Sequence, residues 1–140
     1  MGITLSLFCE KNKEKIMTEK EKSQLITDGT GLLNYEYIID NLENGEVDLA
    51  FLLENIVKRD ITGQYIVSIT RYLSAVNREK YASEITHLIA VAIERDKERR
   101  YIGALLTDIW GADYASRVDE LNEKDDNFRR IYKRIYPKGI

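Results

Sequence analysis

Proline interrupts an α-helix more strongly than any other residue, because it lacks a backbone N–H donor and clashes with the preceding turn. This chain has one proline in 140 residues, Pro137, close to its C-terminal end. Helices are therefore free to form along almost the whole length. Glycines, capping residues and the spacing of apolar side chains decide where each helix begins and ends.

The clearest helical pattern covers residues 80–96, with the sequence KYASEITHLIAVAIERD. Apolar residues recur there at positions i, i+3, i+4, i+7 and i+8, which places them on one face of an α-helix. Ala90 and Val91 widen this face beyond what a surface helix needs. We therefore expect a central helix with neighbours on more than one side, built on Ile85, Leu88, Ile89, Ala92 and Ile93.

The same spacing recurs in other stretches and predicts an all-α fold. These stretches are residues 35–42, 49–57, 65–76, 101–109, 114–121 and 128–136. Outside residues 3–8, no stretch alternates apolar and polar residues as a strand does. The expected helix caps are Thr30, Asp60 or Thr62, Asn77, Asp96, and Asp125 or Asp126. We predict a compact single-domain bundle of six or seven short helices, in which sequential neighbours pack antiparallel across short connections.

A weak internal repeat suggests an alternative packing. Tyr65, Tyr81 and Tyr101 are each followed by two aliphatic residues at intervals of four. A helical-repeat protein of the HEAT kind would show a repetition of this type. However, the tyrosines are separated by 16 and then 20 residues, and shared amphipathicity explains the match equally well. The compact bundle is therefore the preferred prediction.

The N-terminal region is expected to differ from the rest of the chain. Residues 1–24 should form a partly flexible leader, followed by an all-helical domain at 25–136 and a short tail at 137–140. The sequence MGITLS fits the pattern for N-myristoylation, with Cys9 and nearby lysines as a second membrane signal. Membrane attachment would require acylation of Gly2. Without it we expect a cytoplasmic protein, because no apolar run is long enough to span a bilayer and one cysteine excludes an intramolecular disulfide framework.

No arrangement of residues in the sequence indicates catalysis, a cofactor or a metal. His87 and Cys9 are the only histidine and cysteine, so a metal site made mainly of imidazole or thiolate ligands is excluded. Glu84 and His87 form one i, i+3 pair, whereas a di-metal helical bundle needs two such pairs. The glycines form neither a phosphate-binding loop nor a dinucleotide fingerprint. We therefore expect no enzymatic activity, no cofactor and no metal.

Basic residues gather in the C-terminal stripe beside two tyrosines, an arrangement that can bind phosphate groups. The net charge of −3 gives no overall electrostatic case for a nucleic-acid partner. A solvated outer face is the simpler interpretation, and nucleic-acid binding is kept as an alternative. The basic residues are Arg129, Arg130, Lys133, Arg134 and Lys138.

The second and third apolar stretches carry apolar residues on both sides of their helices. Leu33 and Tyr37 lie opposite the stripe at 35–42, and Val47 and Phe51 lie opposite the stripe at 49–57. Such second faces are either covered within the protein's own fold or bind another protein. Residues 36–60 hold seven acidic and two basic residues, so the surroundings of these faces should be acidic.

Aromatic residues inside a charged rim are the usual anatomy of a protein interface, and an acidic rim suits a partner with a basic surface. We therefore expect a non-catalytic protein–protein interaction module. Its simplest form would be an inhibitor such as a toxin-neutralising immunity protein. The alternatives are a lipid-anchored accessory or adaptor protein, a nucleic-acid-binding helical domain and a self-assembling structural unit. The predicted interaction patch comprises Leu33, Tyr37, Asp40, Val47, Asp48, Phe51 and Glu54.

Overall fold

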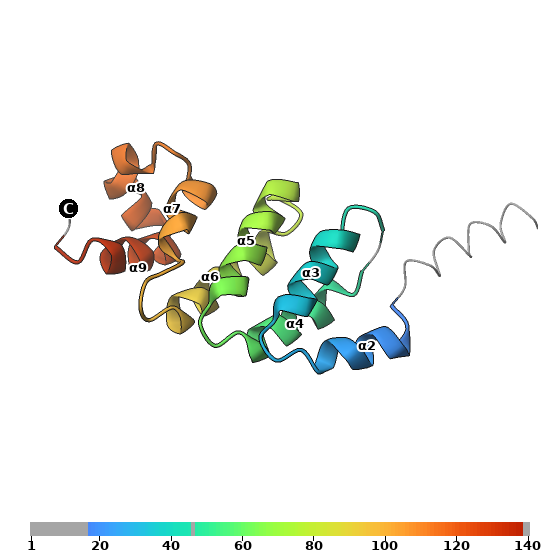
Figure 1. The fold of residues 1–140 in the computed structure, drawn as a ribbon. Coiled ribbons are helices and arrows are strands. Elements are labelled where there is room, and N and C mark those ends of the chain that lie inside the picture. Colours follow the sequence, from blue (N-terminus) through green and yellow to red (C-terminus); the bar gives the residue numbers. More distant parts are fainter. Residues whose placement is uncertain (1–16, 46, 139–140) are drawn as a thin grey trace, which may run out of the picture. The chain divides into compact units, whose positions relative to one another are not determined.

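The structure is a computed structural model that describes residues 17–45 and 47–138. These residues form eight α-helices and one 3₁₀ helix, η1, and contain no strand (Figure 1). The predicted all-α class is confirmed, with slightly more helices than expected. The helices are α2 (Glu19–Ile26), α3 (Leu32–Asn41), α4 (Leu49–Arg59), α5 (Gln64–Asn77), α6 (Ala82–Arg95), α7 (Gly103–Trp110), η1 (Tyr114–Arg117), α8 (Val118–Lys124) and α9 (Asp126–Ile135).

The helices belong to two compact units, Met1–Arg59 and Asp60–Ile140. The first unit contains α2, α3 and α4, and the second contains α5 to α9. Residues 1–16, which include the myristoylation pattern and Cys9, lie outside the described residues. Residues 19–24, placed in the leader by the sequence, belong to α2. The predicted domain limits stay predictions. No helix among the described residues is both long and apolar enough to cross a membrane.

In the first unit, α3 packs against α4 and α2 also contacts α4. Ile38, Leu52 and Ile56 are completely buried and form the centre of this packing. Thr18 caps α2: its hydroxyl accepts a hydrogen bond from the Glu21 N–H at 3.1 Å, and the Glu21 carboxylate accepts one from the Thr18 N–H at 2.9 Å. This reciprocal capping fixes the start of α2.

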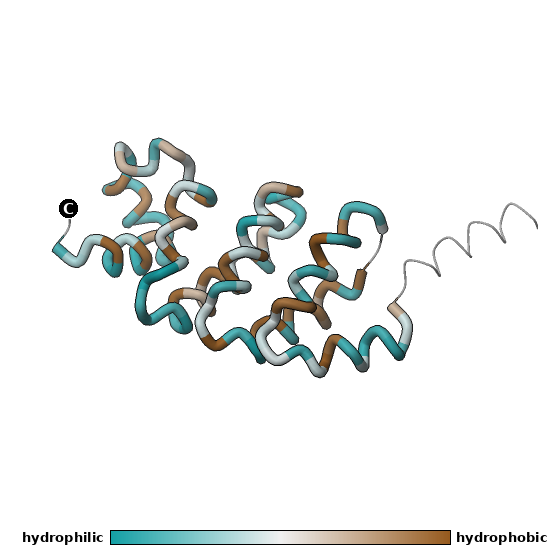
Figure 2. The backbone as a smooth tube through the Cα atoms, viewed as in Figure 1, coloured by the Kyte–Doolittle hydropathy of each residue, from teal (hydrophilic) through white to brown (hydrophobic). Residues whose placement is uncertain are grey.

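In the second unit, α6 is the central helix that the sequence predicted. It packs against α5 and α9, and α7 contacts both α5 and α9. Apolar and polar segments alternate along each helix, as amphipathic helices require (Figure 2). All five residues of the predicted face of α6 are buried: Ile85, Leu88, Ile89, Ala92 and Ile93.

Three connections between helices are built around a buried aspartate. Asp28 precedes α3, Asp60 precedes α5 and Asp96 precedes α7; they are 3%, 2% and 2% exposed. A helix start leaves backbone N–H groups without partners, and a buried carboxylate is costly unless it accepts hydrogen bonds. Each of these turns, here called an aspartate turn, satisfies both requirements at once.

In the first aspartate turn, Asp28 Oδ1 accepts hydrogen bonds from the N–H groups of Thr30 and Gly31, both at 3.1 Å. Its Oδ2 accepts from the Asn34 N–H at 3.1 Å and from the Asn34 side-chain amide at 2.9 Å. Burial raises the pKa of Asp28, but the hydrogen bonds from Asn34, Thr30 and Gly31 outweigh it. The pKa of Asp28 therefore lies below its ordinary value.

The second turn repeats these bonds. Asp60 Oδ1 accepts from the N–H groups of Thr62 and Gly63 at 3.3 and 3.0 Å, and Oδ2 accepts from the Ile66 N–H at 2.8 Å. Both turns have the sequence Asp-x-Thr-Gly, and in both the threonine hydroxyl accepts from the N–H two residues later. The backbone hydrogen bonds of the two turns therefore match, as their tetrapeptides do, while the side-chain bonds to the aspartate differ: the Asn34 amide donates in the first turn and the Thr62 hydroxyl in the second.

The third turn also contains a buried aspartate, but it lacks the threonine and the glycine of the first two turns. Asp96 Oδ1 accepts from the Arg100 N–H at 2.9 Å, and Oδ2 accepts from the N–H groups of Tyr101 and Ile102 at 2.7 and 2.8 Å. The third residue after each aspartate has a positive φ: 98° at Gly31, 89° at Gly63 and 59° at Arg99. Glycine adopts this conformation at little cost, whereas a residue with a Cβ does not.

One predicted N-cap is confirmed at its position, Asp125 of α9, whereas the N-cap residues of α3, α5 and α7 are Gly31, Gly63 and Ile102 and the predicted side chains lie earlier in the chain. Asp60 and Thr62 both accept backbone bonds ahead of α5, Asp96 does so ahead of α7, and Asp125 accepts from the Phe128 N–H at 3.1 Å. At α3 the main acceptor is Asp28, and Thr30 contributes one bond. The prediction that Asn77 caps α6 is wrong. Asn77 is the last residue of α5, and its side-chain oxygen accepts a hydrogen bond from the Lys80 N–H in the connection between α5 and α6.

The aspartate turns also define a sequence spacing that the tyrosine repeat missed. Asp28, Asp60 and Asp96 are separated by 32 and 36 residues. Tyr65 and Tyr101 both stand five residues after an aspartate, whereas Tyr81 immediately precedes α6. Tyr65 and Tyr101 therefore occupy equivalent positions relative to an aspartate turn, and Tyr81 does not, so the three tyrosines do not mark a single repeat.

The positive φ at Arg99 generates a prediction. Arg99→Gly and Arg99→Ala both remove the guanidinium that donates to the Arg134 carbonyl at 3.3 Å. Only glycine relieves the left-handed backbone, so we expect Arg99→Gly to be more stable than Arg99→Ala by about 1 kcal/mol. Urea denaturation followed by the fluorescence of Trp110, the single tryptophan, measures this difference within the second unit.

Lys97 provides the matched control, because its φ is not positive. There the order should reverse, with Lys97→Ala at least as stable as Lys97→Gly. Equal stabilities of the two Arg99 variants would show that the left-handed conformation carries no cost.

Candidate protein-binding site

The seven residues of the predicted interaction patch all lie in the first unit. Leu33, Tyr37 and Asp40 are on α3, Phe51 and Glu54 are on α4, and the remaining two immediately precede α4: Val47 and Asp48. Leu33, Asp40, Asp48 and Glu54 are exposed, and the other three are half-buried. The patch is therefore part surface and part packed interior.

The two aromatic residues of the patch contact α2. The Tyr37 hydroxyl donates to Glu21 Oε2 at 3.3 Å, and the Lys22 ammonium lies 5.4 Å from the centroid of the Phe51 ring. Burial, the charge of Glu21 and this hydrogen bond raise the pKa of Tyr37. Tyr37 and Phe51 are thus covered in part by a helix that the sequence had assigned to the leader.

Two of the three acidic residues around the aromatics also have partners within the unit. Asp48 forms an ion pair with Lys22 at 3.4 Å and accepts from the Phe51 N–H at 3.2 Å. Glu54 pairs with Lys58 at 3.1 Å. Exposed pairs of this kind contribute little to stability, so a partner's cation can replace the lysine without a large penalty.

Among the described residues of this unit, the exposed large apolar side chains flank the first aspartate turn. Ile26 and Leu33 are each 49% exposed and Leu32 is 38% exposed. We call these three residues the turn cluster. Leu33 belongs to the predicted patch; Ile26 and Leu32 were missed. The sequence feature that could have identified them is their position: Ile26 is the last residue of α2, and Leu32 is the first residue of α3, so both are apolar residues at a helix end beside the turn.

Asn34 explains why the leucines face outward. It is completely buried, and its amide donates to the Leu25 carbonyl at 3.0 Å and to Asp28. Its oxygen accepts from the Asn55 amide on α4 at 2.9 Å. Asn34 therefore fixes the rotation of α3 through bonds to residues of α2, the turn and α4. With Asn34 and Ile38 facing inward, Leu32 and Leu33 point elsewhere.

The backbone beneath the turn cluster is held as well. Arg59, the last residue of α4, donates from Nη2 to the Ile26 carbonyl at 3.2 Å. Together with the four bonds to Asp28, this holds both sides of the turn. Side chains presented from a fixed backbone lose less conformational freedom on binding than those on a mobile loop.

The basic C-terminal residues are partly used within the second unit. Arg129 pairs with Asp126, and Arg134 donates to the Ile93 carbonyl. The Tyr132 and Tyr136 rings lie 4.9 Å apart, centroid to centroid. Tyr132 also stacks on the buried Phe128, so this ring belongs to an internal aromatic cluster.

His87, the one histidine, is exposed. Within residues 17–45 and 47–138, no three or more histidine, cysteine, aspartate or glutamate side chains lie together in a way that could hold a metal ion. No family model matches the chain, and neither a curated protein nor a solved structure matches it.

The contacts of α2 generate a prediction about the patch. Phe51→Ala should lower the free energy of unfolding by about 1–2 kcal/mol, less than the ~3–5 kcal/mol of a fully buried phenylalanine, because Phe51 is only half-buried. Leu33→Ala should change it by less than about 0.5 kcal/mol. Urea denaturation followed by circular dichroism measures both.

Leu52→Ala is the matched control for this comparison, since Leu52 is completely buried in the same unit. It should cost about 2–5 kcal/mol. If Phe51→Ala costs as much as Leu52→Ala, Phe51 is core and no part of a binding surface. If it costs nothing, α2 does not cover it.

Proposed function

We propose that this protein is a non-catalytic binding module whose first unit binds another protein through the turn cluster. The observation that carries the proposal is the exposure of Ile26, Leu32 and Leu33 beside a turn held by buried hydrogen bonds. Removing apolar surface from water contributes about 25 cal/mol per Å². A partner that covers this cluster therefore gains affinity without having to order the turn.

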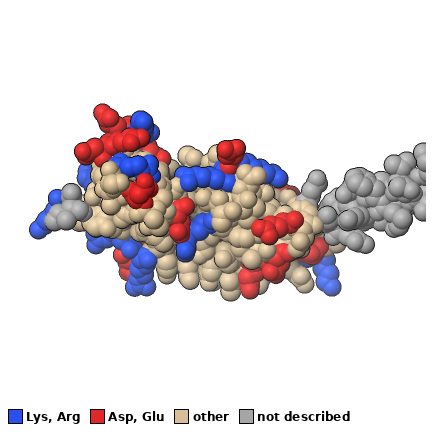
Figure 3. Space-filling model, turned by 90° about the horizontal axis from the view of Figure 1, so that it is seen from above, with Lys and Arg blue, Asp and Glu red and all other residues tan. Residues whose placement is uncertain are grey.

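The surroundings of the cluster favour a partner with a basic surface. Figure 3 shows acidic side chains close together on the first unit, toward the right of the view. An apolar centre with a charged rim is the usual composition of a protein interface. Acidic residues also speed the encounter with a basic partner more than they add affinity. Among the described residues of α3, α4 and their connection, the exposed acids are Glu36, Asp40, Glu43, Asp48 and Glu54.

In its finer form the proposal is that binding inhibits the partner, as a toxin-neutralising immunity protein does. The small size of the chain and the acidity of residues 36–60 support this form. Tyr37 and Phe51 take a supporting part, because they pack between the helices beneath the rim. Leu33 is the residue of the predicted patch that can make the largest new apolar contact.

The test is capture of partners from native lysate with the wild type and matched variants, followed by titration of the partner that is identified. Leu33→Asp should weaken binding by about tenfold or more and leave the melting temperature nearly unchanged. Ala112→Asp introduces the same charge at an exposed position of the second unit and should bind like the wild type.

Inhibition is tested by adding the module to the partner in equal amounts and measuring the partner's own activity. Loss of that activity supports the finer proposal. If Leu33→Asp and Leu32→Asp both retain full binding, the turn cluster is not the binding surface.

A further inference from the structure

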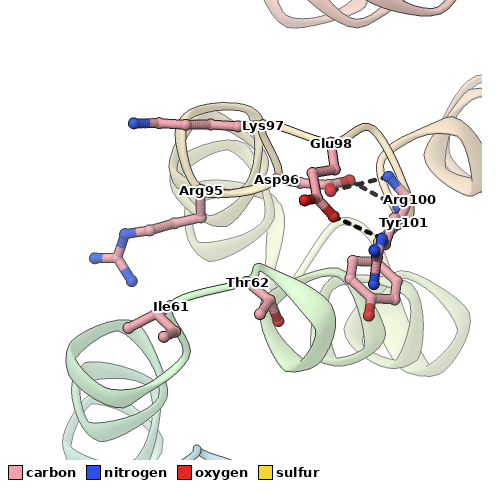
Figure 4. Close-up of a pocket in the computed structure, with 8 residues that line it drawn as sticks. All are labelled: Ile61, Thr62, Arg95, Asp96, Lys97, Glu98, Arg100 and Tyr101. Atoms are coloured by element: carbon pink, nitrogen blue, oxygen red, sulfur yellow. Dashed lines mark hydrogen bonds and ion pairs between the residues drawn. The ribbon is translucent and has the colours of Figure 1, made fainter.

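A hollow of about 250 Å³ lies in the second unit, between its two aspartate turns. In Figure 4, Ile61 lies beneath Arg95 at one end of the hollow, and Thr62 lies toward Arg100 and Tyr101 of the turn before α7. Small-molecule sites usually measure about 300–1,000 Å³. The hollow is therefore of a size for one or two side chains of a peptide.

Ile61 forms an unusual wall for this hollow. It is 80% exposed, more than any other large apolar residue that the structure describes. The turn beneath it is fixed, since Asp60 accepts bonds from Thr62, Gly63 and Ile66. Tyr101 adds a half-buried ring on the opposite side. The hollow thus offers an exposed apolar side chain, Ile61, on a turn whose backbone is held by hydrogen bonds.

The charge on the rim is positive, because one of the two acids in residues 95–100 is removed from the surface. Asp96 is 2% exposed, and its oxygens accept three backbone hydrogen bonds. Glu98, the other acid, pairs with Arg100 at 2.7 Å. Three cations line the hollow against these two acids: Arg95, Lys97 and Arg100.

These cations are positioned in different ways. Arg95 donates from Nη1 to the Asp60 carbonyl at 2.8 Å, which joins the rim to the turn on the other side. Lys97 extends outward from the rim in Figure 4 and is exposed. Within the described part of the chain it has no ion-pair partner. The rim therefore combines a hydrogen-bonded guanidinium with an exposed ammonium.

We propose that this hollow binds an acidic peptide segment of a partner protein, in which an apolar side chain is flanked by aspartate or glutamate. The apolar side chain would contact Ile61 and Tyr101, and the flanking carboxylates would pair with the cations of the rim. A peptide is favoured over a nucleic acid because the wall offers an exposed isoleucine, whereas single-stranded nucleic acids are bound mainly by stacking on exposed aromatic rings. This site lies in the second unit and does not rest on the function proposed for the first.

The experiment uses the full chain and an array of short synthetic peptides with a leucine or phenylalanine between acidic residues. Peptides with lysine in place of the acids, and with serine in place of the apolar residue, serve as controls. Binding of the best peptides is then measured by fluorescence polarisation. Their affinity should fall as the salt concentration rises, since exposed charges contribute much of it.

Three variants locate the site. Lys97→Glu should weaken peptide binding by about tenfold, and Ile61→Ser should weaken it by about fivefold. Lys133→Glu makes the same charge change at an exposed position of α9 and should leave binding unchanged. All three positions are exposed or half-exposed surface, and unaltered melting curves establish that the variants fold.

The proposal is overturned if no acidic peptide binds with a dissociation constant below about 100 µM. It is also overturned if Lys133→Glu weakens binding as much as Lys97→Glu, because the effect is then one of net charge. Two further outcomes would assign the hollow to another occupant. One is tighter binding of a single-stranded oligonucleotide that Lys97→Glu and Ile61→Ser abolish. The other is self-association of the chain that the same two variants abolish.

Discussion

The hydrogen bonds between a buried aspartate and the backbone at the start of the next helix are the interaction on which the rest of this structure depends. Each unit contains the arrangement: Asp28 in the first, and Asp60 and Asp96 in the second. A carboxylate removed from water needs several donors, and a helix start supplies donors that have no partner in the helix. The connections are therefore fixed by polar contacts, while the helices are held by their apolar faces.

Both proposed binding surfaces follow from this constraint. An apolar side chain on a mobile loop would fold inward or lose freedom on binding. Beside an aspartate turn it is presented to solvent from a fixed backbone, as Leu33 and Ile61 are. The first surface has an acidic rim and the second a basic one, so the same kind of turn is combined with opposite charge and is suited to partners of opposite character.

The sequence predicted the buried helix faces more fully than the contacts between helices. The periodicity of Ile85 to Ile93 gave the buried face of α6 directly, because burial and spacing are coupled in a helix. Asn34 could not be found in this way: it is polar, yet it is buried by bonds to α2, the turn and α4. The contact between Lys22 and the Phe51 ring is made by residues that are 29 positions apart in the sequence. Such contacts depend on how helices pack, which no local pattern contains.

The most direct test of the aspartate turns is the stability of Asp28→Asn as a function of pH, measured by circular dichroism in urea. Because the pKa of Asp28 is lowered in the folded state, its stabilisation is present above the unfolded pKa of about 3.9 and is lost as the pH falls through the folded value. Asp28→Asn should be less stable by about 2 kcal/mol at pH 7, and the gap should narrow below about pH 4. Glu36→Gln, at an exposed position in the middle of α3, should change the stability by less than about 0.5 kcal/mol at every pH. A loss below about 0.5 kcal/mol for Asp28→Asn, or a gap that does not change with pH, would contradict the account.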